Sequence, residues 1–134
     1  RVLNLAEARG LTVLLPNPRR ALDFPSALEL RVLLEELRGA PLAPLLDLPA
    51  AHLASTMRLC PLRETIAAFG TGPLALLGDA CGAVGALPPG HGEVRVAAVA
   101  RALPKDTRFA FVPWPMLREE EILEGYRAVR ALGA

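Results

Sequence analysis

The chain has 134 residues, of which 52% are hydrophobic and 22% charged, and this composition predicts one globular domain over residues 1–134 with a substantial core. No apolar run approaches the roughly 18 to 20 residues that cross a bilayer, so we expect no membrane partner. Fifteen basic residues balance fourteen acidic ones without a basic cluster, so we expect no nucleic-acid partner either.

Two further features concern the compartment and the start of the chain. Cys60 and Cys81 stand apart without metal-type spacing, which predicts reduced thiols in a cytoplasmic protein. The first residue is Arg1 rather than Met, and no signal-like segment follows it. We therefore interpret the chain as a fragment or a trimmed product.

Individual residues mark the boundaries of the first strand and of the helices before and after it. Residues 2–9 have helical spacing that stops at Gly10, which predicts the end of a helix. Residues 11–15 are a short apolar run with a β-branched pair, which predicts a buried strand. Ser26 and Glu29 stand three apart ahead of a run of leucines, so a capping box should open the helix that follows.

The same pattern recurs twice in the middle of the chain. Residues 42–46 predict a second strand that ends at Asp47, and a loop that holds His52 follows. Residues 62–69 carry a helical apolar stripe. Residues 73–77 predict the third strand, so a repeat of one strand and one helix emerges.

The third strand leads into a long segment rich in glycine and proline, residues 78–93, which we predict to be a functional loop. Residues 94–103 predict a helix, residues 107–112 a fourth strand, and residues 118–132 a last helix with three glutamates in its first turn. Alternating βα units of about thirty residues predict an α/β fold with a parallel sheet. Four units fit an open doubly wound sheet or half of an eight-stranded barrel.

Four segments at the strand ends resemble motifs of the sugar phosphate isomerase/epimerase superfamily, the xylose-isomerase-like barrels that also include endonuclease IV. Residues 45–53 are similar to the family's Asp-Thr-Gly-His-Ala-His motif, and residues 76–79 with Gly82 resemble its His-x-His-Asp strand end. Residues 87–94 are similar to its His-Leu-Pro-x-Gly-x-Gly-x-Val-Asp loop, and residues 14–17 stand where it reads Leu-Leu-Glu-Asn. The motifs occur in the family's order over nearly the whole chain.

The resemblance implies a (β/α)8 barrel in which this chain supplies units five to eight, with a divalent metal at the strand ends. Carried over by position, Asp47 and Asp79 keep acidic residues, and His52 matches the family's second, non-ligand histidine. The other ligand positions hold residues that cannot bind a metal through their side chains: Pro16, Ala50, Leu76, Gly78, Ala86 and Pro113. Two carboxylates alone make a poor divalent site, so we predict no metal and no other cofactor.

Three functions follow from this resemblance. The first is a sugar phosphate isomerase/epimerase-like protein with a degenerate metal site. The second is a non-catalytic relative that binds a ligand or a partner, and the third is a structural fragment that needs its missing amino-terminal half. A sugar or sugar phosphate is the expected ligand. Open edges at the first and last strands predict a homo-oligomer or pairing with that missing half.

The candidate site residues follow the strands: Asn17, Asp47, His52, Asp79, His91 and Glu93. Because the carboxyl ends of parallel strands meet at one edge, we expect Asn17, Asp47, Asp79 and the loop of residues 85–93 to converge, with Asp79 less exposed than an ordinary loop aspartate and nearest the centre. The alternative is that both aspartates only accept backbone N–H bonds, those to Asp79 coming from the residues just after it, Cys81 or Gly82.

The remaining candidates also have two interpretations. His52 would be a base or a half-buried loop histidine, and His91 a ligand or an exposed loop residue. Arg19 and Arg20 follow the first strand, where a sugar phosphate would bind, although they also suit a solvated loop.

Overall fold

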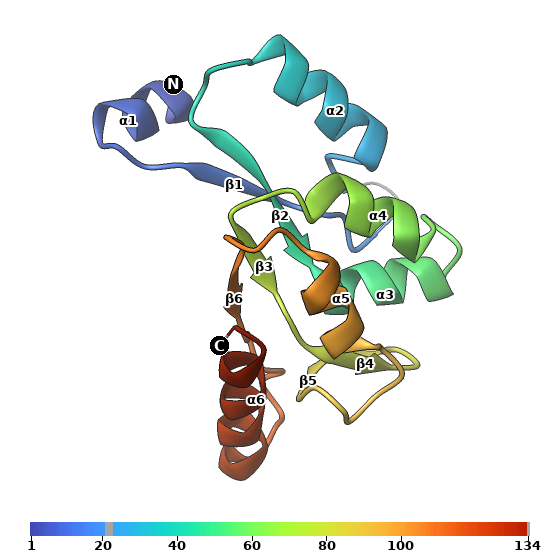
Figure 1. Ribbon diagram of the computed structural model, residues 1–134. Coiled ribbons are helices and arrows are strands. Elements are labelled where there is room, and N and C mark those ends of the chain that lie inside the picture. The colour runs from blue at the N-terminus through green and yellow to red at the C-terminus, as the bar shows by residue number, and fades with distance from the viewer. Residues whose placement is uncertain (21–22, 134) are drawn as a thin grey trace.

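The computed structural model describes residues 1–20 and 23–133, which fold into a parallel sheet with helices packed against it (Figure 1). The helices in this part of the chain are α1 (Val2–Ala8), α2 (Ala27–Glu36), α3 (Leu48–Thr56), α4 (Leu62–Phe69), α5 (Val96–Ala102) and α6 (Glu119–Leu132). The strands are β1 (Val13–Pro16), β2 (Leu42–Asp47), β3 (Leu74–Leu76), β4 (Asp79–Cys81), β5 (Val84–Leu87) and β6 (Arg108–Ala110).

The main sheet contains β1, β2, β3 and β6 in that order, and every neighbouring pair is parallel. Leu46, Ala75 and Phe109 form one row across β2, β3 and β6. The strands therefore follow one another in space as they do along the chain, with β1 and β6 at the open edges. This confirms the predicted α/β fold with parallel βα repeats.

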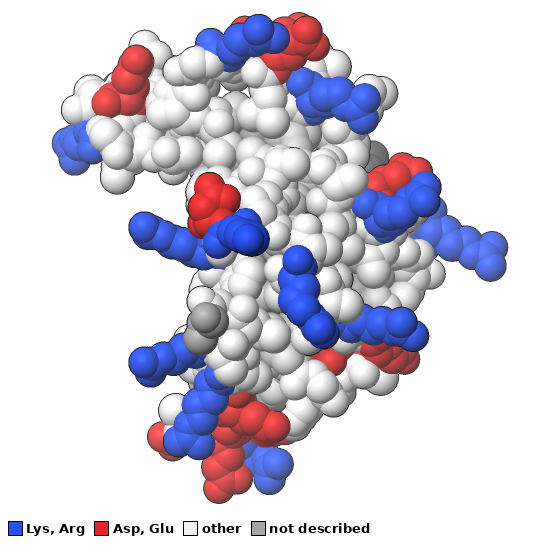
Figure 2. Space-filling view, in the orientation of Figure 1, with Lys and Arg blue, Asp and Glu red and all other residues white. Residues whose placement is uncertain are grey.

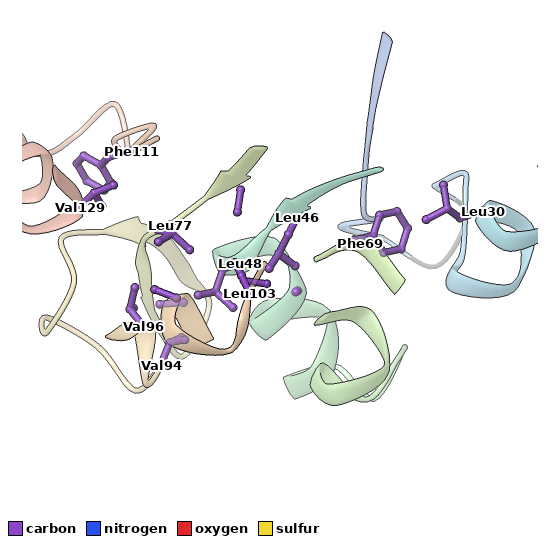
Figure 3. Packing of buried hydrophobic residues seen from close by; sticks show 14 residues of the cluster. Leu30, Leu46, Leu48, Phe69, Leu77, Val94, Val96, Leu103, Phe111 and Val129 are labelled. Atoms are coloured by element: carbon purple, nitrogen blue, oxygen red, sulfur yellow. The ribbon is translucent and has the colours of Figure 1, made fainter. Parts of the chain in front are cut away.

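The two faces of this sheet differ in what covers them. Figure 1 shows α2, α3, α4 and α5 together on one side, and Leu46, Ala75 and Leu77 are buried against that side in the core cluster of Figure 3. The strand residues that alternate with them are half-buried and lie outside the cluster: Leu14, Leu45, Leu74 and Leu76. These four residues define what we call the helix-free face.

Helix starts and stops that depend on residues close in sequence occur where the sequence predicted them. The Ser26 side chain accepts from the Glu29 N–H at 3.3 Å, and the Glu29 carboxylate accepts from the Ser26 N–H at 2.8 Å, so the predicted capping box opens α2. Gly10 and Gly39 adopt φ values of 62° and 90° after their helices. Only glycine takes this left-handed conformation at little cost, which is why the helical patterns stop there.

The prediction that His52 lies in a loop was wrong, because residues 48–56 form α3. Asp47 is the N-cap of this helix, and its carboxylate accepts from the Ala50 N–H at 3.0 Å. Pro49 stands in the first turn, where its missing N–H costs nothing, and alanine and leucine follow it. The same residues that resemble a family loop motif thus carry the start signal of a helix.

The prediction of one long loop over residues 78–93 was also wrong in part. Its first half is the antiparallel hairpin of β4 and β5, in which Cys81 pairs with Val84 across a two-residue turn. Gly82 has a φ of 56° in that turn, as tight hairpins require. In the main sheet, β3 and β6 are shorter than the apolar runs that predicted them, whereas β1 extends to Pro16 and β2 to Asp47.

The face of the molecule drawn in Figure 2 has no field of one charge. No helix among the described residues is long and apolar enough to cross a membrane. On the face drawn in Figure 2, basic and acidic side chains are interspersed along the outline of the molecule. Interspersed charge of this kind gives no strong electrostatic attraction for a polyanion.

Candidate functional site

A cavity of about 320 Å³ lies at the carboxyl edge of the main sheet. Residues that end or follow each of the four strands line it: Arg19 after β1, Asp47 of β2, Leu76 of β3 and Trp114 after β6. The start of α3 and the hairpin strand β5 close other sides. The cavity therefore lies where ligands bind in parallel α/β folds, at the carboxyl ends of the strands.

One end of the cavity is polar and is built around Asp47. One carboxylate oxygen of Asp47 pairs with the Arg19 guanidinium at 2.5 Å, and the other caps α3 through Ala50. The Asp47 N–H donates to Asn17 Oδ1 at 2.7 Å, which fixes the orientation of that buried amide. Asn17 Nδ2 lies buried without a hydrogen-bond partner among the described residues. Asn17 and Asp47 thus lie together, as predicted, and each carboxylate oxygen of Asp47 already accepts one hydrogen bond.

Arg19 is the exposed part of this polar end, since 69% of its side chain is accessible to solvent. The hydrogen bond to Asp47 uses one guanidinium nitrogen, and an arginine carries five N–H donors in a planar fork. Asp47 therefore anchors the guanidinium at the rim of the cavity and leaves further donors free to turn toward a ligand.

The rest of the lining is mainly apolar, and Trp114 is its largest side chain. Trp114 lies between Pro113 and Pro115, and 44% of its surface is exposed. Its backbone N–H donates to the carbonyl of Ala86 at 3.1 Å, which ties the segment after β6 to β5. Two prolines and this bond hold the backbone that carries the indole ring at the cavity, and the ring supplies an apolar surface.

Asp79 does not line the cavity and instead organises the segment after β3. It has no exposed surface, which confirms that it is less exposed than an ordinary loop aspartate, but it does not stand nearest the centre of this cavity. Its Oδ1 accepts from Ala80 and Val94 N–H at 2.8 Å each, and its Oδ2 accepts from Gly90 N–H at 2.9 Å. The alternative of backbone hydrogen bonding is thus the one observed. The predicted donors were wrong, because one donor is the adjacent Ala80 and the chain folds back to supply the other two from 11 and 15 residues away.

Glu93 lies shortly before α5, outside the cavity, and contacts α3 and β4. Its carboxylate lies 3.5 Å from His52 Nε2 on α3 and accepts the Cys81 S–H at 3.6 Å. The His52 contact is too poorly aligned to count as a hydrogen bond, since Nε2 has no such partner in the described residues. The hydrogen bond and the negative charge of Glu93 raise the pKa of the Cys81 thiol. A thiol kept protonated in this way is a poor nucleophile.

His91 serves a similar tethering role on the other side of the loop. Its Nε2 lies 2.9 Å from Glu124 Oε1 on α6, so the loop before α5 is linked to the last helix. Neither His91 nor His52 lines the cavity. Of the six predicted site residues, only Asp47 lines the cavity, and Asn17 supports it through the Asp47 N–H, while the other four hold the loop and hairpin in shape.

The divalent metal that the resemblance implies does not fit these residues. No three His, Cys, Asp or Glu side chains are grouped for metal binding within residues 1–20 and 23–133. The carboxylate oxygens of Asp47 and Asp79 are taken up by a guanidinium and by backbone N–H groups. A divalent cation prefers several free oxygen ligands, and removing these would uncap α3 or open the loop.

Sequence reasoning missed Trp114 as part of the site and treated Arg19 as one of two equivalent arginines. A signal for Trp114 was present, because the only tryptophan of the chain stands between two prolines directly after the fourth strand. Nothing local distinguishes Arg19 from Arg20. Their difference arises from the contact of Arg19 with Asp47, which is 28 positions away.

Comparisons of the chain with protein-family models, with curated proteins and with solved structures gave no match.

Proposed function

We propose that this chain is half of an isomerase/epimerase-like barrel and acts as a ligand-binding relative of that family, taking a sugar or sugar phosphate at the carboxyl edge of its sheet. The motifs at the strand ends support the family assignment. The strand order supports the half barrel, because the strands follow one another and α2 to α5 cover a single face. A doubly wound sheet reverses its order and has helices on both faces.

The observation that carries the proposal is the pairing of an indole surface with an anchored guanidinium in one cavity. Trp114 offers a flat apolar surface for the C–H face of a sugar ring, and Arg19 offers N–H donors for hydroxyl or phosphate oxygens. The volume of about 320 Å³ suits one small molecule, since ligand pockets start near roughly 300 Å³.

Binding without the family's metal chemistry fits the residues better than isomerisation does. A base at this site must have a free lone pair within reach of a substrate proton. Asp47 is the carboxylate of the cavity, and each of its oxygens already accepts one hydrogen bond, from Arg19 or from Ala50, so proton abstraction would compete with these contacts. Its part is therefore to hold Arg19 and α3 in position.

Calorimetric titration with fructose 6-phosphate and with fructose tests this proposal. We expect saturable binding that weakens about tenfold or more in Arg19→Gln and in Trp114→Ala, because each loses one side of the ligand contact. Arg20→Gln is the matched control, because Arg20 lies outside the cavity. The affinity of this variant for fructose 6-phosphate should equal that of the wild type. Absence of binding, or equal loss in both arginine variants, would contradict the proposal.

A thermal-shift series with Mg²⁺, Mn²⁺, Co²⁺ and Zn²⁺ separates binding from metal-dependent isomerisation. A metal that binds only the native state must raise the unfolding midpoint, and we expect no such rise. A rise that Asp47→Asn abolishes would favour the catalytic member of the family instead.

A further inference from the structure

The chain exposes more surface than its mass requires. Its accessible surface is 8778 Å², whereas a compact monomer of 14.3 kDa exposes about 6,800 Å². The difference is about 2,000 Å², and a stable protein–protein interface needs roughly 800 Å² from each partner. The excess is therefore large enough for an extensive interface.

The helix-free face is one apolar part of this surface. Leu14, Leu45, Leu74 and Leu76 stand on it and remain half-buried outside the core cluster. Figure 1 shows open space on this side of the sheet, opposite α2 to α5. Parallel sheets are as a rule covered on both faces, because their strands are apolar on both. On β6 the exposed Arg108 stands beside Leu74 on this face, so a partner must cover the leucines and accommodate one cation.

The two edges of the sheet define what this partner must look like. β1 and β6 each pair on one side only, and both run in the same direction in a sheet of parallel strands. A two-fold axis parallel to the strands would place β1 of one copy beside β6 of the other at both edges. Eight strands would then close, and eight is the number at which side chains fill the interior of a barrel.

The helices that flank these edges carry exposed apolar side chains. Val2 and Leu5 of α1, which leads into β1, are 69% and 59% exposed, and Leu123 of α6 is 46% exposed. α6 packs on β6. In the closed ring, α1 of one copy would lie near α6 of the other, so these side chains would be buried together.

We infer that the helix-free face binds a second copy of this chain, giving a two-fold symmetric ring of eight parallel strands. The ring also completes the ligand cavity. Asp47 and Leu76, which line the cavity, are register partners at the carboxyl end of the helix-free face. The cavity therefore opens toward the centre of the ring, where the second copy supplies the opposite wall.

Sedimentation equilibrium of the 134-residue chain tests this inference independently of any ligand. We expect a dimer, twice 14.3 kDa, over a roughly hundredfold range of concentration. Leu74→Glu places a charge at the centre of the helix-free face and should yield a monomer. Leu28→Glu is the matched control, because Leu28 is 66% exposed on α2 and should leave the dimer intact. A wild-type monomer, an open-ended series of larger species, or a Leu74→Glu dimer would overturn the inference.

Hydrogen exchange of the wild-type chain keeps the inference testable if Leu74→Glu fails to fold. Amides of β1 and β6 that gain partners across the two new edges should exchange more slowly as protein concentration rises. Amides of β2, which are paired within one copy, serve as the internal reference. Exchange at β1 and β6 that does not depend on concentration would overturn the second-copy assignment and leave the face to a different chain.

Discussion

Replacing Asp79 with Asn tests whether this buried carboxylate has a structural role. The native carboxylate accepts three backbone N–H bonds, two at Oδ1 from Ala80 and Val94 and one at Oδ2 from Gly90. An asparagine has the same shape but only one oxygen. If that oxygen keeps the two bonds at the Oδ1 position, its NH2 group faces the Gly90 N–H, and two donors then oppose each other.

The magnitude follows from that one lost bond. A donor left unpaired in a buried site, and the loss of a charged acceptor, together cost about 1 to 3 kcal/mol. For a chain of 134 residues this corresponds to a midpoint lower by about 4 to 10 °C. Asp79→Ala removes all three bonds and should cost more. Ligand affinity should stay unchanged in Asp79→Asn measured below its midpoint, because Asp79 does not line the cavity.

Urea unfolding followed by circular dichroism gives the free energy of unfolding, and Asp106→Asn is the matched control on an exposed aspartate. We expect the control to lie within about 0.5 kcal/mol of the wild type. An Asp79→Asn protein that is as stable as the control would refute the structural account. A stable variant that has lost ligand binding would restore Asp79 as a site residue.

Three further changes test other parts of the structure. Gly125→Ala should destabilise by about 1 to 3 kcal/mol in urea unfolding, because its Cβ would lie 2.2 Å from a ring carbon of buried Phe111; a stability gain would show that the ring can shift. Ser26→Ala should cost about 1 kcal/mol by removing the cap of α2, and no change would mean that the capping box is not formed in solution. Glu93→Gln should speed alkylation of Cys81 by iodoacetamide near pH 8, since Glu93 raises the thiol pKa and its removal increases the thiolate fraction there. The gain should vanish at pH values above both thiol pKa values, and an unchanged rate near pH 8 would contradict the contact.

The features that sequence alone predicted are those fixed by neighbours along the chain. Ser26 and Glu29 are three positions apart, and Gly10 and Gly39 act at single backbone sites, so their helix starts and stops could be read directly. The four apolar runs predicted the parallel strands because the strands are apolar on both faces, apart from Arg108 in β6 and Asp47 at the end of β2. For the same reason the sequence could not predict which face of the sheet the helices cover, because this depends on tertiary packing.

The features that were missed depend on contacts between distant residues or on competing local signals. Asp47 and Pro49 start a helix by ordinary capping rules, yet they also fit a family motif that places a loop there. The donors to Asp79 include Val94, fifteen positions away, and Arg19 meets Asp47 across 28 positions. The spacing of apolar residues along the chain does not predict contacts between residues so far apart. The cavity itself could be placed at the strand ends only in general terms, and its lining residues needed the packed structure.

Intrinsic fluorescence measures the central claim most directly, because Trp114 is the only tryptophan of the chain and lines the cavity. Titration with fructose 6-phosphate should give a saturable change in its emission, with a dissociation constant about tenfold or more higher in Arg19→Gln and unchanged in Arg20→Gln. An emission spectrum that stays constant up to about 10 mM sugar phosphate would contradict ligand binding at this cavity. Identical titrations of wild type and Arg19→Gln would contradict the role assigned to the anchored guanidinium.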